Sequence, residues 1–245
     1  MRLTRCYVAA PLHPGDNRVL PGDVSAHVAR VLRARAGQML TLFDGRGGEY
    51  EARIVAIDRR GVQVQIEQHR AVERESPLTV TLLQALARGE RMDLIVQKAT
   101  ELGVAGIVAL TGERSVVHLD GAGLARRCEH WRAVAISACE QCGRNRVPTI
   151  GAVADLESAC AQSDATSVRL LLAPDADLTL TAAVRQASSI SLAVGPEGGF
   201  SDEEIAHAQH HGFRCCRLGP RVLRAETAPL AALAAIQAVA GDFLS

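Results

Sequence analysis

The run Gly195-Pro196-Glu197-Gly198-Gly199 places a carboxylate among glycines, between the apolar segment Ser189–Val194 and Ser201. It therefore has the form of a loop between a strand and a helix. Such loops often bind phosphate, but this one matches neither G-x-x-x-x-G-K-[ST] nor G-x-G-x-x-G, and its acidic residues would repel a phosphate. The residues favour a neutral or positively charged ligand, held by backbone groups that glycine leaves accessible. A tight turn that binds nothing is the alternative.

A helix is predicted to start at Ser201. Ser201 and Glu204 have the spacing of a capping box, and Phe200 and Ile205 have the spacing of a hydrophobic staple. Acidic residues fill the first turn, where the helix dipole favours them.

Two further loops resemble the first in leaving a strand through proline. They are Ala173-Pro174-Asp175 and Gly219-Pro220-Arg221. In parallel sheets the ligand lies at the carboxyl ends of the strands. The three loops therefore predict one shared crevice, provided that their strands are neighbours.

The chain as a whole has the composition of a globular protein with one or two domains: 245 residues, 48% hydrophobic and 22% charged. It contains no apolar run of 18 residues and no secretory h-region, so seven cysteines predict reduced thiols and a cytoplasmic location. Net charge is zero, but residues 1–72 carry 11 basic against 7 acidic side chains, or +4, which leaves −4 for the remainder. A modest basic excess is a weak indication of nucleic-acid binding.

Residues 1–72 predict a small antiparallel barrel. Gly61–Gln68 alternates apolar and polar residues strictly, and Gln38–Asp58 reads as two strands around the turn Asp44–Gly48. A short helix is expected from Asp23 to about Arg33. Closure of these strands as a barrel is the natural solution.

Beyond a linker at Glu73–Pro77, the pattern changes to strands that alternate with helices, which predicts a mostly parallel sheet with helices on both faces. The expected strands are residues 78–86, 104–110, 168–174, 189–194 and 216–220, and the expected helices include residues 90–103, 126–142 and 227–243.

Five motifs in order resemble the RsmE family, whose members are bacterial methyltransferases that act on N3 of a uridine in 16S ribosomal RNA. They are RGERMDLIVQKATELGV (88–104), ERSVVHL (113–119), CEQCGRNRVP (139–148), VGPEGGFSDEEI (194–205) and LGPRVLRAETAPLAAL (218–233). The resemblance spans nearly the full chain and includes a PUA-like barrel at its start.

This resemblance implies a domain organisation. Residues 1–72 would be a PUA-like, RNA-binding β-barrel, and residues 77–245 a SPOUT methyltransferase domain, an α/β fold with a trefoil knot that holds the cofactor. A knot would be an exception to the rule that chains do not thread loops. The family uses S-adenosylmethionine and is homodimeric, so 16S RNA, alone or within the 30S subunit, and a second copy are the expected partners.

The cofactor carries a sulfonium cation and no phosphate, which agrees with the character of the glycine loop. The residues expected to bind it are Ala173, Pro174, Gly195, Glu197, Gly198, Gly199, Leu218, Gly219, Leu223, Arg224 and Thr227. The family usually has Thr where this chain has Ala225, and Pro229 is unusual. Both are expected to adjust the edge of the pocket; Pro229 would fall in the first turn of the last helix if Thr227 caps it.

Methyl transfer to N3 of uracil requires that N3 lose its proton. Glu197 or Glu226 is the expected proton acceptor, and Arg221 or Arg224 is expected to stabilise charge on the uracil oxygens. For Glu226, the alternative is a carboxylate that lies at a helix start only because the helix dipole favours negative charge there. The arginines expected to bind RNA phosphates are Arg5, Arg30, Arg33, Arg88, Arg91, Arg114 and Arg144, although surface arginines without a ligand are common.

No metal site is predicted. Cys139 and Cys142 have the spacing of a zinc or redox pair, but no second such pair accompanies them, and on a helix the two thiols simply share one face. Two other functions stay open: methylation of a different RNA, and RNA binding without catalysis.

Overall fold

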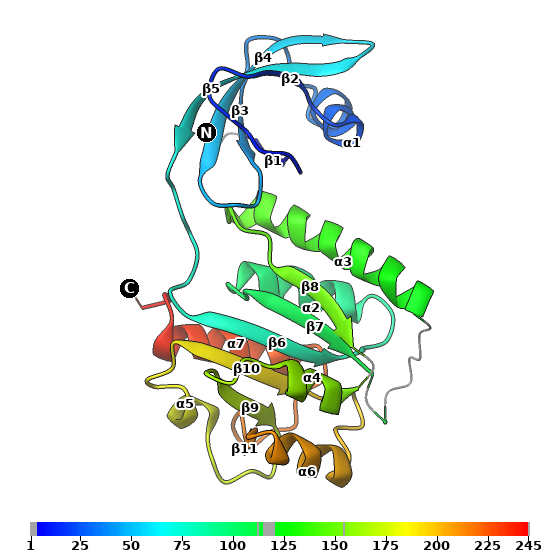
Figure 1. Ribbon diagram of the computed structural model, residues 1–245, viewed down its shortest axis with the longest axis vertical. Coiled ribbons are helices and arrows are strands. Elements are labelled where there is room, and N and C mark those ends of the chain that lie inside the picture. Colours follow the sequence, from blue (N-terminus) through cyan, green and yellow to red (C-terminus); the bar gives the residue numbers. More distant parts are fainter. Residues whose placement is uncertain (1–3, 112, 115–120, 154, 245) are drawn as a thin grey trace. The chain divides into compact units, whose positions relative to one another are not determined.

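The computed structural model describes residues 4–111, 113–114, 121–153 and 155–244, which form two compact units (Figure 1). The first unit is Met1–Glu75 together with Cys139–Val147, a stretch from much later in the sequence. The second is Ser76–Ala138 and Pro148–Ser245. The change of unit after Glu75 lies inside the stretch Glu73–Pro77.

The first unit is built on a five-stranded sheet of order β1-β3-β4-β5-β2. Its strands are β1 (Arg5–Tyr7), β2 (Asn17–Val19), β3 (Met39–Phe43), β4 (Glu49–Asp58) and β5 (Gly61–Arg70). β3, β4 and β5 pair antiparallel in sequence order, which confirms the hairpin predicted around Asp44–Gly48 and the antiparallel strand predicted at Gly61–Gln68. The alternation in β5 is confirmed, because Val62, Val64 and Ile66 are buried in the core.

The predicted helix from Asp23 to Arg33 consists of two parts. α1 (Gly22–Ala26) continues into a π-helical turn, η1 (His27–Val31). The segment ends where Arg33 adopts a left-handed backbone conformation with φ of 50°. Val28 is buried on its inner side and packs into the core of this unit.

Residues 139–147 are held in the first unit by a buried polar network. The Arg5 guanidinium donates to the Glu49 carboxylate and to Oδ1 of Asn145, the latter at 2.6 Å. Nε of Arg144 donates to both oxygens of Glu75, at 3.2 and 3.0 Å. Arg5 and Arg144 are only 8% and 4% exposed. The prediction that they bind RNA phosphates is therefore wrong: both are internal ion-pair partners.

The second unit is a six-stranded, wholly parallel sheet of order β11-β9-β10-β6-β7-β8. Its strands are β6 (Thr79–Ala85), β7 (Gly106–Leu110), β8 (Thr149–Val153), β9 (Val168–Leu172), β10 (Ser189–Val194) and β11 (Arg214–Cys216). The helices that the structure describes in this part of the chain are α2 (Arg91–Glu101), α3 (Gly121–Cys142, whose last four residues belong to the first unit), α4 (Leu156–Gln162), α5 (Leu180–Ala183), α6 (Asp202–His210) and α7 (Thr227–Ala240).

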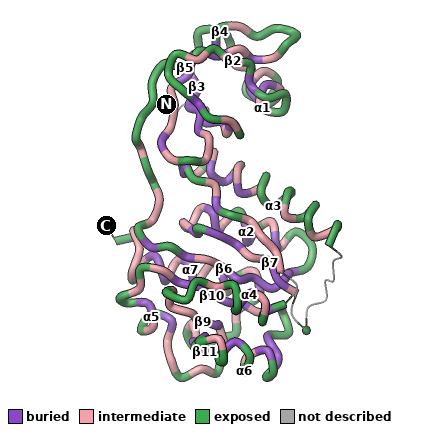
Figure 2. The backbone as a smooth tube through the Cα atoms, in the orientation of Figure 1, coloured by how far each residue is buried: buried purple, intermediate pink, exposed green. Residues whose placement is uncertain are grey.

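Helices cover both faces of this sheet, as predicted. α4 and α6 pack on one face through a cluster that includes Leu83, Leu171, Ala193, Leu156 and Ala208. α2 and α7 contact each other and lie on the opposite face (Figure 1). Figure 2 shows the buried residues following the central strands, while the exposed ones lie on loops and outer helix surfaces.

Several element boundaries differ from the prediction. The last strand is Arg214–Cys216, not residues 216–220, because the backbone of Arg217 bonds with Leu178 and Leu180 and does not continue the pairing with β9. α3 begins five residues earlier than the predicted Arg126, at Gly121. The strands β1, β2 and β8 were not predicted; β1 and β2 have only three residues each, too few to show a period.

The two helix starts next to the glycine and proline loops behave differently. At α6 the capping box is confirmed: the Ser201 hydroxyl accepts from the backbone N–H of Glu204, whose carboxylate accepts from that of Ser201. At α7, Thr227 is not the cap. Glu226 occupies that position without a side-chain capping bond, and Pro229 is buried in the first turn. None of the helices in the described ranges is long and apolar enough to cross a membrane.

Candidate functional site

The carboxyl ends of β9, β10 and β11 open into a cavity of about 850 Å³. The three strands are neighbours in the sheet, so the loops that follow them converge as predicted. A volume of this size is typical of sites for small molecules. The predicted crevice is therefore present.

The cavity is lined by most of the residues predicted for the cofactor. These are Ala173, Pro174, Gly195, Glu197, Gly198, Gly199, Leu218, Gly219, Leu223 and Arg224. Thr227 is exposed and does not line the cavity, whereas its neighbours Glu226 and Ala228 do. Ala225 also lines it, but Pro229 does not. That these residues bind a cofactor stays a prediction.

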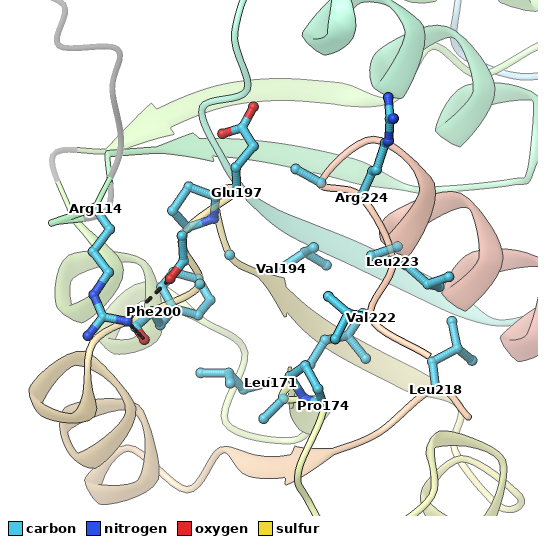
Figure 3. Close-up of a pocket in the computed structure, with 18 of the residues that line it drawn as sticks. Arg114, Leu171, Pro174, Val194, Glu197, Phe200, Leu218, Val222, Leu223 and Arg224 are labelled. Carbon is cyan, nitrogen blue, oxygen red and sulfur yellow. Dashed lines mark hydrogen bonds between the residues drawn. The ribbon is translucent and has the colours of Figure 1, made fainter. Parts of the chain in front are cut away.

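One part of the cavity wall is apolar. Figure 3 shows Leu171, Pro174, Leu218 and Val222 gathered on one side, while Glu197 and Arg224 extend away from them. Val222 is 81% exposed although it is apolar. The site therefore offers an apolar surface and a charged rim, a combination that suits a ligand with both an aromatic ring and a charge.

The glycines of the loop after β10 are needed for its shape. Gly199 has φ of 70° and donates its backbone N–H to the carbonyl of Pro196 at 2.9 Å, which closes a tight turn. A Cβ atom at Gly195 would lie 3.2 Å from the backbone N of Phe200 and 3.3 Å from backbone atoms of Gly199. A side chain at Gly195 would therefore crowd the backbone of its own loop, which would have to shift by a few tenths of an ångström.

The charged rim is organised around Arg91, the first residue of α2. Nη1 of Arg91 donates to Oε1 of Glu197 at 2.7 Å, and its Nε lies 3.8 Å from Oε2 of Glu226. Arg91 was predicted to bind RNA phosphate, but the structure pairs it with two carboxylates that line the cavity. Such a cluster places fixed negative and positive charge beside any ligand.

Arg114 supports the glycine loop and itself lines the cavity. Its Nη1 donates to the carbonyl oxygens of Gly198 at 3.2 Å and of Phe200 at 3.4 Å (Figure 3). The neighbouring backbone N–H of Glu113 donates to Oε1 of Glu204 at 2.9 Å. Arg114 was also predicted to bind RNA, and its role in holding this loop was not visible from the sequence. The rest of the motif, residues 115–119, lies outside the described residues.

The other arginines predicted to bind RNA are placed differently. Arg30, Arg33 and Arg88 are exposed and make no ion pair among the residues that the structure describes. They stay candidates for contacts with phosphate.

The thiols show no sign of joint chemistry. All seven cysteines are free. Burial raises the pKa of the Cys139 thiol to about 12, and its Sγ lies 3.5 Å from the backbone carbonyl of Arg146. Within the described ranges, no three Cys, His, Asp or Glu side chains are grouped so that they could hold a metal ion.

Known proteins are similar to this chain in sequence and in fold. Residues 74–237 match the model of an RNA methyltransferase domain, and residues 20–67 match that of an RNA methyltransferase PUA domain. A methyltransferase structure from Legionella pneumophila with bound S-adenosylmethionine is 40% identical, with a TM-score of 0.95 over 99% of this chain and 100% of that one. Ribosomal RNA small subunit methyltransferase E from Neisseria gonorrhoeae, also with S-adenosylmethionine, is 36% identical, with a TM-score of 0.92 over 99% and 100%.

These matches define the class: a parallel-sheet α/β RNA methyltransferase domain accompanied by a PUA domain. Among sequence relatives, ribosomal RNA small subunit methyltransferase E of Mycobacterium bovis is 34% identical over 235 residues, which are 94% of this chain and 89% of that protein. The chain belongs to the ribosomal RNA small subunit methyltransferase E family, and the resemblance seen in the five motifs is confirmed.

Proposed function

We propose that this protein transfers a methyl group from S-adenosylmethionine to N3 of one uridine in 16S ribosomal RNA. The observation that carries this proposal is the cavity formed by three converging strand exits in a member of this family. Relatives of 40% and 36% identity contain S-adenosylmethionine. The choice of N3 and of a uridine rests on the family resemblance.

The residues around the cavity fit this cofactor. The glycine loop offers backbone groups but no Lys and no phosphate pattern, and Glu197 is compatible with a cation. Leu171, Leu218 and Leu223 provide apolar surface for an adenine. When bound, S-adenosylmethionine supplies an electrophilic methyl group on its sulfonium.

The charged rim faces the place where a substrate base enters. Since N3 lies on the Watson–Crick edge, the uridine has to leave any stack or pair before it reaches the cavity. Arg221 and Arg224 line the cavity and would stabilise charge on O2 and O4 of the uracil. Glu197 and Glu226 are the carboxylates within reach of the same rim. Holding both reactants in line supplies much of the rate acceleration in such a displacement.

The first unit would contact the RNA, through its PUA-related sheet and the exposed Arg30 and Arg33. Binding should then weaken steeply with salt. The closed barrel, the trefoil knot around the cofactor, the homodimer, the 30S subunit as substrate and the cytoplasmic location belong to this proposal through the family resemblance. Exposed apolar side chains in and just after the last turn of α7, namely Val239, Phe243 and Leu244, support the dimer.

The experiment combines calorimetry with RNA mapping. The purified protein and a Gly195→Val variant are titrated with S-adenosylmethionine, and 16S RNA and 30S subunits that lack the modification are then incubated with protein and cofactor. Saturable binding, lost in the variant, and a single 3-methyluridine found by mass spectrometry are expected. Binding of RNA without binding of cofactor, in a folded protein, would refute the proposal in favour of a non-catalytic RNA-binding protein; a methyl group on another RNA would refute only the choice of substrate.

A further inference from the structure

Glu226 differs from Glu197 in the way its carboxylate is used. Oε1 of Glu197 accepts a hydrogen bond of 2.7 Å from Arg91, and this side chain is 33% exposed. Oε2 of Glu226 is buried and, within the part of the chain that the structure describes, accepts no hydrogen bond. The nearest guanidinium nitrogen, Nε of Arg91, stays 3.8 Å away, beyond hydrogen-bonding distance.

The Glu226 side chain also makes no hydrogen bond to the start of α7. It occupies the position before Thr227, where a side chain could accept from the free N–H groups of α7. Instead its backbone is already helical and its side chain makes no capping bond. Glu226 therefore makes no capping bond, and a favourable interaction with the helix dipole remains the alternative for this carboxylate.

A buried carboxylate oxygen without a donor is unusual, because leaving it unpaired costs free energy. Glu226 lines the cavity while its Oε2 is shielded from solvent, so a rotation of the carboxylate toward a ligand in the cavity would give Oε2 the missing donor. The donor that the proposed reaction must remove is the N3–H of uracil.

We propose that Glu226 is the proton acceptor of the reaction and that Arg91, which is bonded to Glu197, is a positioning residue for the Glu226 carboxylate. This inference rests on the proposed function. Oε2 of Glu226 takes the N3 proton, and the electron pair left on N3 forms the new N–C bond to the methyl group. The C–S bond breaks with its electrons moving to sulfur, which becomes a neutral thioether. The protonated Glu226 then releases its proton to water.

Arg91 suits the positioning role because it contacts Glu197 more closely than Glu226. Its 2.7 Å bond to Glu197 fixes the guanidinium, while the 3.8 Å separation from Glu226 leaves Oε2 without a hydrogen bond. Loss of Arg91 should therefore lower turnover through the placement of Glu226, with little change in cofactor affinity.

The test compares Glu226→Gln with Glu203→Gln, an exposed carboxylate in the first turn of α6 that does not line the cavity. Methyl transfer is measured on small subunits reconstituted from transcribed 16S RNA that contains either uridine or 5-fluorouridine. Fluorine makes N3–H more acidic, so it reduces the need for a proton acceptor. On uridine, kcat of Glu226→Gln should fall by about 100-fold or more, as expected for loss of a general base.

On 5-fluorouridine the deficit of Glu226→Gln relative to the wild type should shrink at least tenfold, while Glu203→Gln matches the wild type on both RNAs. The Kd for S-adenosylmethionine should be unchanged in both variants. An equal deficit on both RNAs, or a Kd that rises as much as kcat falls, would overturn the assignment, the latter by making Glu226 a ligand of the cofactor. If the wild type itself methylates no 16S uridine, the proposed function fails instead.

Discussion

Removing the Arg114 side chain should loosen the glycine loop and weaken cofactor binding. The Arg114 guanidinium donates to the carbonyls of Gly198 and Phe200, at 3.2 and 3.4 Å, and Arg114 and Gly198 both line the cavity. In Arg114→Ala the loop loses both bonds and has more conformations to give up when a ligand binds. The proposed ligand for this measurement is S-adenosylmethionine.

The magnitude follows from the two contacts. A buried hydrogen bond to a charged group contributes about 1.5–3 kcal/mol. Arg114 is exposed and its second contact is long at 3.4 Å, so both bonds together should contribute only about 1–1.5 kcal/mol. That corresponds to a roughly 5- to 13-fold rise in Kd.

Isothermal titration of four proteins checks this reasoning: the wild type, Arg114→Ala, Arg114→Lys and the control Arg126→Ala, whose exposed arginine lies in α3 away from the cavity. Lys can donate to one of the carbonyls but lacks the planar fork, so its Kd should lie between the other two. The control should bind as the wild type does. An Arg114→Ala variant that binds within twofold of the wild type would refute the idea that Arg114 preorganises the loop.

Three further predictions concern the loop and the first unit. Gly195→Ala should raise the cofactor Kd by about 5- to 150-fold, since its Cβ would meet backbone atoms of the same loop at 3.2–3.3 Å. Gly121→Ala, whose Cβ would meet nothing within 4 Å and which lies away from the cavity, should change the Kd by less than about 3-fold in the same titration. Arg144→Ala leaves the mostly buried Glu75 without its partner and should lower the free energy of urea unfolding by about 2–4 kcal/mol. Burial raises the pKa of Glu140 above its usual value and outweighs the backbone hydrogen bond from Tyr7, which lowers it. The protonated carboxyl therefore contributes stability at acidic pH, and this contribution is lost as pH rises through the folded-state pKa. Since Gln stays neutral, Glu140→Gln should raise the free energy of unfolding more at pH 7 than at pH 4.

Matched controls exist for these experiments. Arg53→Ala removes a surface partner of Glu67, with side chains 47% and 33% exposed, and should cost less than about 1 kcal/mol. If it cost as much as Arg144→Ala, burial would not be the reason for the difference. Equal Kd values for the two glycine variants, or a pH-independent effect at Glu140, would contradict the other two predictions.

The elements around the cavity were predictable because each depends on residues close together in the sequence. The capping box at Ser201 sets the start of α6 without help from the rest of the fold. The run Ser189–Val194 matches β10 residue for residue. Proline at three strand exits predicted a shared crevice on the condition that the strands are neighbours. The order β11-β9-β10 meets this condition.

The roles of single arginines were not predictable in the same way. Arg5 and Arg144 look like any basic residue in the sequence, yet each is buried against a carboxylate far away along the chain. Arg91 and Arg114 are likewise committed to partners about a hundred positions away. The sequence shows how many arginines there are, but whether each one is exposed or paired depends on contacts with residues far away in the chain.

The discontinuity of the first unit has a consequence for its synthesis. A ribosome that has just made Glu75 has supplied all five strands, but Asn145 and Arg144, which complete the network around Arg5 and Glu75, come roughly 70 residues later. At about 5–20 residues per second, the nascent sheet waits some 4–14 s for them. During that interval Arg5 and Glu75 lack these partners, so the first unit, although it comes first in the chain, cannot reach its final fold before much of the second has been translated. A fragment ending at Glu75 should for the same reason be less stable than the same unit within the full chain.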